Sequence, residues 1–238
     1  MLGIIGGSGF YALGKKLAET DVLTPYGTAK LQMVSLLGEK LVFIPRHGVR
    51  HTLPPHKINY RANIAALKKA GVTGVMAVYA SGVISKYKPG DIVLVDDFIS
   101  LWQHATFYDD FSGGIRHTDF SEPCDMEIRK KLLEVAAVSK VKVKTGGIMA
   151  CTRGPRFETK AEIRLLKKAG ANLVNMTAGY EMALLGEAEI DYAAIAVGTN
   201  YATGISKKHL SAEETLGTMH TAYGRLMTLI GNFAGEIV

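Results

Sequence analysis

Arginine and histidine side chains gather in one short stretch of the sequence, directly after an apolar run. Two arginines and three histidines lie within 11 residues, at Arg46, His47, Arg50, His51 and His56. A guanidinium group can hold two oxygens of a phosphate at once, so Arg46 is a candidate anion ligand. The alternative is a metal site built from the histidines. No carboxylate or cysteine accompanies them, so we expect no metal here.

A glycine-rich turn follows the first apolar run of the chain. Backbone N–H groups in residues 6–9 can cradle an anion, and the Ser8 hydroxyl adds a further donor. The spacing matches neither the GxGxxG fingerprint of dinucleotide-binding proteins nor the GxxxxGK[ST] loop of P-loop proteins. The turn therefore predicts either an anion site or a plain tight turn, and both interpretations stay open.

Two further groups of polar and aromatic residues stand where strands are expected to end. In residues 154–159, Phe157 could stack on a flat ring, and Glu158 could accept hydrogen bonds from ring N–H groups. The alternative is a helix N-terminus, which favours an acidic residue such as Glu158. Residues 175–177 and 199–200 follow two later apolar runs. Polar residues at strand ends are typical of α/β binding sites, although singly they are also common in turns.

Apolar runs alternate with helical patterns along the chain. This order predicts an α/β fold with a mixed, mostly parallel central sheet flanked by helices. No linker or repeat interrupts it, so we expect residues 1–238 to form a single domain. The expected strands are residues 1–5, 31–37, 41–45, 74–80, 91–95, 147–151, 172–176 and 192–197. The expected helices are residues 58–70, 125–139, 159–169, 181–188 and a terminal helix opened by a capping box at Ser211 and Glu214.

Residues 100–123 break this alternation. The segment is irregular and polar, yet it holds the aromatic residues Trp102, Phe107, Tyr108, Phe111 and Phe120. So many aromatic side chains predict an ordered functional loop rather than a linker.

Composition excludes several classes of protein. The 238 residues include 28 Lys and Arg and 22 Asp and Glu, a net charge of +6, but the basic residues are scattered along the chain. A nucleic-acid partner is therefore not expected, whereas a small anionic substrate fits the charge. No uncharged stretch reaches the roughly 20 apolar residues of a membrane span, so no membrane partner is expected. The first residues lack the basic start of a signal peptide, and two cysteines cannot form a disulfide framework, so we expect a cytoplasmic protein.

Taken in order, these motifs resemble those of the trimeric purine nucleoside phosphorylase and methylthioadenosine phosphorylase family. The matching segments are residues 4–9, 46–48 with His51, 55–63, 154–159, and 175–177 with Glu181. The resemblance extends from residue 1 to near residue 200 and is weaker in the last helix. It implies that inorganic phosphate, as co-substrate and without a further cofactor, cleaves the N-glycosidic bond of a purine nucleoside. The products are a free base and a pentose 1-phosphate.

The resemblance also implies roles for individual residues. It assigns to the phosphate site Ser8, Arg46, His47 and Thr177, together with the Ala80 backbone. It assigns Met176 to the ribose. The base site consists of Phe157, Glu158 and Asn200. Asn200 and His51 are its candidate catalytic residues, and Asn200 can donate a hydrogen bond to the departing base. His117, in the long loop, is similar to a residue that family members lend to a neighbouring subunit. A homotrimer or a dimer of trimers is therefore implied.

Counting donors and acceptors predicts which base is bound. A 6-oxopurine offers an acceptor at O6 and a donor at N1, which Asn200 and Glu158 complement. Adenine-type relatives have an aspartate in place of Asn200 and a small residue in place of Glu158, so we expect inosine- or guanosine-type bases. At the 5′ end, Ala212 takes the place of a histidine found in inosine-type members, and Leu216 follows one turn later. An apolar pocket there would favour 5′-methylthioinosine, so both 5′ groups stay open.

Two positions depart from the family pattern. Tyr79 is a bulky residue beside the predicted phosphate site, and Tyr180 stands where a proline usually precedes the glutamate. Three alternatives stay open: a 5′-methylthioadenosine phosphorylase, a nucleoside hydrolase, and a non-catalytic nucleoside sensor on the same fold, for which Tyr79 is the only support.

Overall fold

The computed structural model describes residues 1–101, 105–207 and 209–237, so Trp102 of the predicted loop lies outside the described residues. The strands are β1 (Leu2–Gly6), β2 (Lys15–Thr24), β3 (Gly27–Leu36), β4 (Glu39–Pro45), β5 (Gly74–Val83), β6 (Ile92–Ile99), β7 (Val143–Cys151), β8 (Leu173–Asn175) and β9 (Asp191–Tyr201). The helices are η1 (Pro55–Lys57), α1 (Tyr60–Lys69), α2 (Met126–Val138), α3 (Lys160–Lys168), α4 (Ala178–Glu187) and α5 (Ala212–Ile237).

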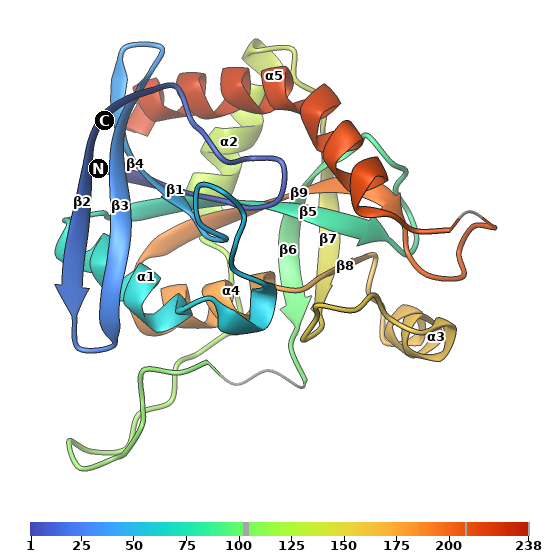
Figure 1. Cartoon of the computed structure of the whole chain (residues 1–238), viewed down its shortest axis with the longest axis horizontal. Helices are drawn as coiled ribbons and strands as arrows, with labels where there is room; N and C mark the ends of the chain where they lie inside the picture. Colours follow the sequence, from blue (N-terminus) through green and yellow to red (C-terminus); the bar gives the residue numbers. More distant parts are fainter. Residues whose placement is uncertain (102–104, 208, 238) are drawn as a thin grey trace.

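The strands form one mixed sheet in the order β2-β3-β4-β1-β5-β8-β7-β6-β9, and β9 also pairs with β5. The pairs β1–β4, β1–β5, β5–β9, β6–β7 and β7–β8 are parallel. The pairs β2–β3, β3–β4, β5–β8 and β6–β9 are antiparallel. The β5–β9 pair closes one half of the sheet into a small barrel, while the β1–β4 half stays open (Figure 1). The predicted mixed, mostly parallel sheet is confirmed.

The central strands are buried on both faces, which is why their sequences are continuous apolar runs. All five residues of β1 are buried, and β9 is buried from Tyr192 to Asn200. The strands predicted over residues 1–5, 74–80 and 192–197 therefore match in position. β5 and β9 continue further than predicted, to Val83 and Tyr201, and this extension places Asn200 inside the sheet.

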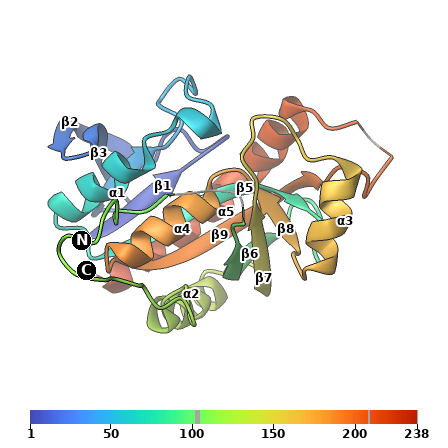
Figure 2. The same cartoon turned by 90° about the horizontal axis from the view of Figure 1, so that it is seen from below.

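Helices cover both faces of the sheet. α1 and α4 pack with Ile5 in one hydrophobic cluster, whereas α2 and α5 pack with Ile4 in a second. Consecutive residues of a strand point to opposite faces, so the two clusters lie on opposite sides of the sheet. Figure 1 shows α5 above the sheet and α1 and α4 below it; Figure 2, seen from below, brings α1 and α4 to the front.

The sequence patterns do not predict β2. Its residues are KKLAETDVLT, and all except Val22 and Thr24 are exposed, so no buried face imposes an apolar alternation along the strand. β2 lies at the end of the strand order and pairs with β3 from Lys15–Ser35 to Thr24–Gly27. Its hydrogen-bonded pairing with β3, the next strand of the chain, identifies it as a strand.

The predicted terminal helix is confirmed as α5. It begins at Ala212, and the Glu214 N–H donates to Ser211 Oγ at 3.2 Å, as expected at a helix start. Across residues 1–101, 105–207 and 209–237, no helix has both the length and the apolar character needed to cross a membrane.

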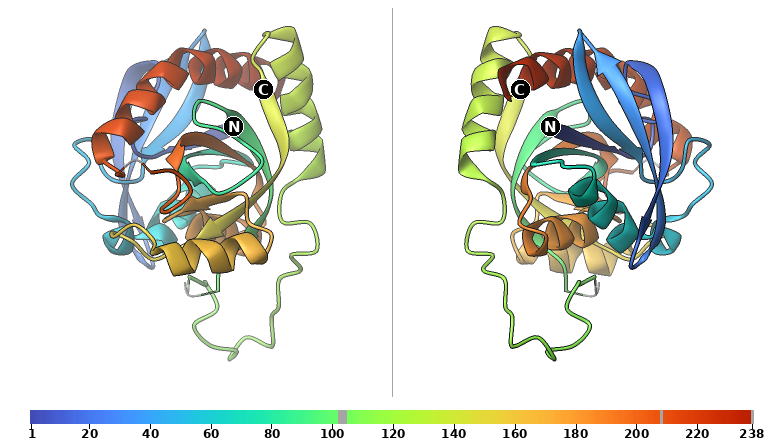
Figure 3. Two further views of the ribbon diagram at one scale, coloured as in Figure 1. Left: turned by 90° about the vertical axis from the view of Figure 1, so that its right-hand side faces the viewer. Right: turned by 90° about the vertical axis from the view of Figure 1, so that its left-hand side faces the viewer.

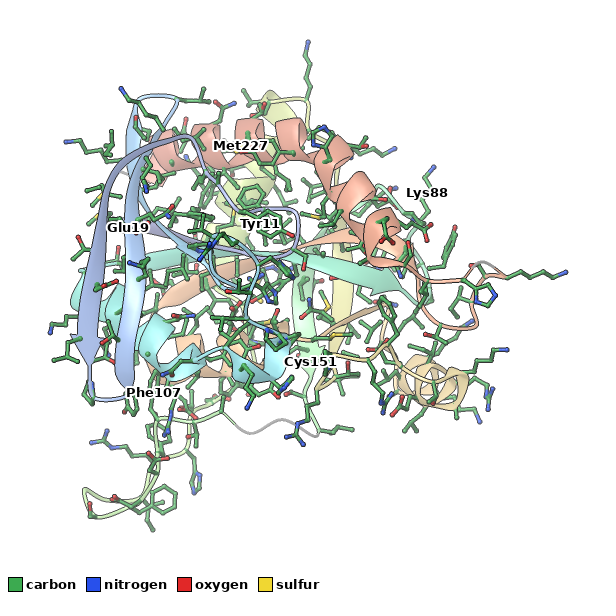
Figure 4. The ribbon with its side chains drawn as sticks, in the orientation of Figure 1. Tyr11, Glu19, Lys88, Phe107, Cys151 and Met227 are labelled. Atoms are coloured by element: carbon green, nitrogen blue, oxygen red, sulfur yellow. The ribbon has the colours of Figure 1, made fainter. Side chains whose placement is uncertain are left out.

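The segment from residue 105 to α2 extends away from the body of the molecule, as both views in Figure 3 show. Its first residues are anchored to α4. The Thr106 hydroxyl and the Phe107 N–H donate to the two oxygens of Glu187, at 2.8 and 2.6 Å. The Phe107 ring, labelled in Figure 4, lies 5.1 Å from the Tyr26 ring. The beginning of this segment is therefore an ordered part of the fold, as predicted.

Candidate active site

Segments that are distant in sequence meet around one cavity of about 570 Å³. The cavity is lined by all but one of the predicted site residues: Ser8, Arg46, His47, His51, Ala80, Phe157, Glu158, Met176, Thr177, Asn200, Ala212 and Leu216. The segments that follow β1, β4, β7 and β8 supply most of them, as expected where strands end in an α/β sheet. The exception is His117, which is exposed in the long loop with its ring 5.8 Å from that of Phe111.

Arg46 is buried, and its guanidinium is engaged by the protein itself. Nε and Nη2 donate to the two oxygens of Glu181 at 2.7 and 2.9 Å, and the side chains of this pair are 1% and 2% exposed. Nη1 donates to the Val78 carbonyl at 2.9 Å, and Nη2 also donates to the Ile5 carbonyl at 3.3 Å. The edge of Arg46 that we expected to grip phosphate is therefore taken by Glu181. Among the described residues, one N–H of Nη1 is left without a partner.

Tyr79 lies behind Arg46 and not in the cavity. Its side chain is completely buried, and its ring centroid is 4.6 Å from the Arg46 Cζ atom. The neighbouring residue Ala80 lines the cavity instead. Burial raises the pKa of Tyr79, so its hydroxyl stays neutral. Tyr79, which departs from the family pattern, therefore packs against the Arg46 guanidinium and does not fill the cavity.

His47 is held in one orientation by its neighbours. Its Nδ1 lies 2.8 Å from the Leu53 carbonyl oxygen, and its ring stacks on that of His51 with centroids 4.4 Å apart. A carbonyl only accepts, so Nδ1 carries the proton and Nε2 keeps a free lone pair. Burial and the nearby Arg46 charge lower the pKa of His47 to about 4, so the ring is neutral near pH 7.

The glycine-rich turn permits a close approach between Arg46 and the chain. A Cβ added at Gly7 would collide with Arg46 Nη1. Gly9 has φ +73°, a left-handed conformation that favours glycine. The turn is closed by the Phe10 N–H, which donates to the Gly7 carbonyl at 2.9 Å. Ser8, between the two glycines, lines the cavity, so the turn is part of the candidate site and not only a connection.

Asn175 joins three parts of the site through its amide. Its Nδ2 donates to the Ala80 carbonyl at 3.1 Å. Its Oδ1 accepts from the Thr177 N–H at 2.6 Å, the Thr177 hydroxyl at 3.2 Å and the Ala178 N–H at 2.7 Å. One side chain thus caps the start of α4 and holds Thr177 at the wall of the cavity. This cap also explains why α4 begins at Ala178, before the predicted start at Glu181.

Glu158 and Asn200 line the same cavity and have opposite hydrogen-bonding character. Glu158 is buried, its Oε1 accepts from the Thr152 hydroxyl at 2.6 Å, and burial raises its pKa. Asn200 Oδ1 accepts from the hydroxyls of Thr199 and Thr215 at 2.8 and 3.4 Å.

The orientation of the Asn200 amide is fixed by the third partner. Nδ2 donates to the Tyr201 carbonyl at 3.1 Å, and because a carbonyl cannot donate, the NH₂ group must lie on this side. Among the described residues, none accepts the second N–H of Nδ2, while the Glu158 carboxylate offers an acceptor. Phe157, which is 42% exposed and lines the same cavity, adds a flat apolar face.

Several lining residues are not identified by sequence reasoning. Tyr11 lines the cavity, and its ring packs edge-on against His51 at 5.2 Å; it is labelled in Figure 4. Leu210 and Thr215 lie near the start of α5 and line it too. Tyr11 stands in an irregular segment with no motif. The amphipathic pattern of the terminal helix is the one signal that could have drawn attention to Thr215.

Comparison with known proteins agrees with this geometry. A sequence profile described as the Phosphorylase superfamily matches residues 1–234. The chain belongs to the phosphorylase superfamily. The resemblance deduced from the motifs is thereby confirmed, and the match also covers the last helix, where the motif resemblance is weak.

Individual members of the phosphorylase superfamily carry related names. A probable 6-oxopurine nucleoside phosphorylase of Moorella thermoacetica is 45% identical over 234 residues, covering 96% of this chain and 90% of that protein. A probable S-methyl-5′-thioinosine phosphorylase of Methanopyrus kandleri is 40% identical over 233 residues, again covering 96% and 90%. A methylthioadenosine phosphorylase of Schistosoma mansoni, solved with adenine, has a TM-score of 0.90 at 29% identity and covers 99% of this chain and 91% of that one.

Proposed function

We propose that this phosphorylase cleaves the N-glycosidic bond of a 6-oxopurine nucleoside with inorganic phosphate, giving the free base and a pentose 1-phosphate. The observation that carries the proposal is the fixed amide of Asn200, which lines the same cavity as the acceptor Glu158. A 6-oxopurine needs a donor at O6 and an acceptor at N1–H, and this pair provides both. The relatives named for 6-oxopurine nucleosides and for methylthioinosine support the same base class.

A 6-aminopurine fits this pair poorly. Its amino group would face the free N–H of Asn200, and its N1 acceptor would face the carboxylate of Glu158. A buried polar group without a partner costs roughly 1–3 kcal/mol, which corresponds to about a tenfold to hundredfold preference. This argument disfavours the alternative of a 5′-methylthioadenosine phosphorylase, although the structural neighbour from Schistosoma mansoni bears that name.

Phosphate would lie against Ser8, His47, Thr177 and the Ala80 backbone, which line the same cavity. One of its oxygens forms a bond to C1′ as the bond from C1′ to the base breaks. The electron pair of the broken bond passes to the purine ring, where the free Asn200 N–H stabilises it, and water then protonates the released base. The phosphate charge stabilises the sugar cation, so no glycosidase-type carboxylate pair is required. No other cofactor enters this reaction.

The 5′ end of the sugar would face apolar side chains. Ala212, Leu216, Leu53 and Leu210 line the cavity and would supply this apolar wall, and Met176, which also lines the cavity, would contact the ribose. Such a wall suits a methylthio group better than a hydroxyl. We therefore propose 5′-methylthioinosine as a substrate beside inosine and guanosine.

One panel of reactions tests the proposal. Adenosine, inosine, guanosine and their 5′-methylthio forms are incubated with and without phosphate, and the free base is quantified. We expect release only with phosphate, and faster release for each 6-oxopurine than for its 6-amino counterpart. Release in phosphate-free buffer would identify a hydrolase, and binding without release would identify a sensor. Faster release from the adenosine forms would contradict the base assignment.

The assembly and location are also proposals. The family resemblance implies that His117 contributes to a neighbouring subunit's site and hence a homotrimer or a dimer of trimers, and its exposed position in the extended loop supports this. Light scattering on the purified protein would give the mass of the assembly. Fractionation of cells would test the proposed cytoplasmic location.

A further inference from the structure

The free ring nitrogen of His47 is an unusual group to find in a site for an anion. Nδ1–H is committed to the Leu53 carbonyl, so Nε2 has only a lone pair to present. His47 lines the cavity, and among the described residues none forms a hydrogen bond with its Nε2. A lone pair repels the fully ionised oxygen of an anion but accepts a hydrogen bond from an oxygen that carries a proton.

We propose that His47 selects a tetrahedral anion that retains a hydroxyl group, by accepting a hydrogen bond from that hydroxyl at Nε2. The inference rests on the proposed function, because it concerns the phosphate of the same site. Hydrogen phosphate and hydrogen arsenate have such a hydroxyl near neutral pH. Sulfate does not, and it has the same shape and the same charge as hydrogen phosphate.

Charge cannot make this distinction in the present site. Arg46 is the only lysine or arginine among the lining residues of the cavity as described, and Glu181 neutralises it through two hydrogen bonds. The groups that face His47 are the Arg46 guanidinium and the His51 ring, and both disfavour a proton on Nε2. Converting His47 into a donor for sulfate would therefore require protonation of a ring whose surroundings oppose it.

The same hydrogen bond would orient the nucleophile. If the phosphate hydroxyl is bound to His47, its proton stays on that oxygen throughout the reaction. The remaining oxygens are unprotonated and free to face the sugar, where one of them forms the bond to C1′. His47 would thus determine which oxygens of phosphate can attack.

The test compares anions that differ only in the hydroxyl. Calorimetry near neutral pH would measure binding of phosphate, arsenate, sulfate and monofluorophosphate, in which fluorine replaces the hydroxyl. We expect phosphate and arsenate to bind alike, and sulfate and monofluorophosphate to bind about tenfold more weakly or worse. In His47→Gln the difference should shrink, because a glutamine amide can turn to donate or accept. The matched control is His220→Gln at an exposed position of α5, which should leave the difference unchanged.

Several outcomes would overturn the inference. Equal binding of phosphate, sulfate and monofluorophosphate to the unaltered protein is one, and persistence of the full difference in His47→Gln is another. If that variant does not fold, nitrogen NMR on the unaltered protein decides, because a proton on Nε2 would exclude the proposed hydrogen bond. Phosphorolysis with equal anion binding would overturn this inference alone. Absence of both phosphorolysis and phosphate binding would overturn the proposed function as well.

Discussion

Asn200 is the residue on which the choice of base depends. Three neighbours hold its amide so that one N–H is left for the ligand, and each of those contacts involves a hydroxyl or carbonyl of the protein. Changing Asn200 to Asp replaces the donor with an acceptor. We expect Asn200→Asp to lower kcat/KM for inosine by about a hundredfold and to improve adenosine relative to inosine.

Steady-state kinetics with the two nucleosides measures this effect. Asn232→Asp makes the same chemical change at an exposed position of α5 and should alter neither value. An unchanged ratio of inosine to adenosine in Asn200→Asp would contradict the role assigned to this amide.

Glu158 leads to a prediction about pH. Burial raises its pKa, so as the pH falls, this carboxylate takes up a proton earlier than an ordinary glutamate. The protonated form can no longer accept the N1–H of a 6-oxopurine through that oxygen. We expect kcat/KM for inosine to fall on the acid side at a pH above the usual glutamate range, and the change to be absent in Glu158→Gln. The pH profiles of both proteins check this, and an identical acid limb in the variant would assign it to another group.

At the scale of secondary structure, Asn175 ties β8, β5 and α4 together. Asn175→Ala removes the cap of α4 and the support of Thr177, so we expect a loss of about 1–2 kcal/mol in the free energy of unfolding and a higher KM for phosphate. Asn175→Asp keeps the acceptor oxygens at the helix N-terminus and should recover part of the stability. Urea unfolding and phosphate kinetics measure the two effects. Wild-type stability in Asn175→Ala would show that the cap is dispensable.

Secondary structure was predictable wherever burial shaped the sequence. β1, β5 and β9 lie between two layers of helices, and their apolar runs indicate them directly. β2 has no buried face, so its charged residues carry no such signal. The start of α4 depends on a hydrogen bond from a side chain of the preceding strand, which residue patterns alone do not indicate.

The candidate site shows the same limit. The residues singled out by the motifs line one cavity, because most of them follow an apolar run and strand ends meet in this fold. They did not predict the partner of Arg46. Glu181 lies 135 residues away in the sequence, and only the folded chain places the two side chains together. Sequence reasoning therefore could not show that Glu181 engages two of the Arg46 N–H groups.

At the scale of the whole molecule, the Arg46–Glu181 pair joins the two halves of the chain. Removing one charge leaves the other buried and uncompensated, so we expect Glu181→Gln to cost about 3–5 kcal/mol of unfolding free energy. The matched control is Asp109→Asn, which breaks the exposed pair with Arg61 and should cost at most about 1 kcal/mol. Chemical denaturation of both variants measures the difference. Similar costs for the two would contradict the importance of burial.

Because β9 also pairs with β5, that end of the sheet has no open edge, and aggregation at high concentration depends on the opposite edge. Among the described strands, the sheet ends on β2, whose outer backbone groups face solvent. Lys30 forms ion pairs with Glu19 and Asp21 across the last two strands. An incoming strand from another molecule would have to desolvate this ladder of charges, so the ladder protects against fibril-like aggregation. Replacing these residues by threonine or valine would allow this edge strand to pair with strands of other molecules.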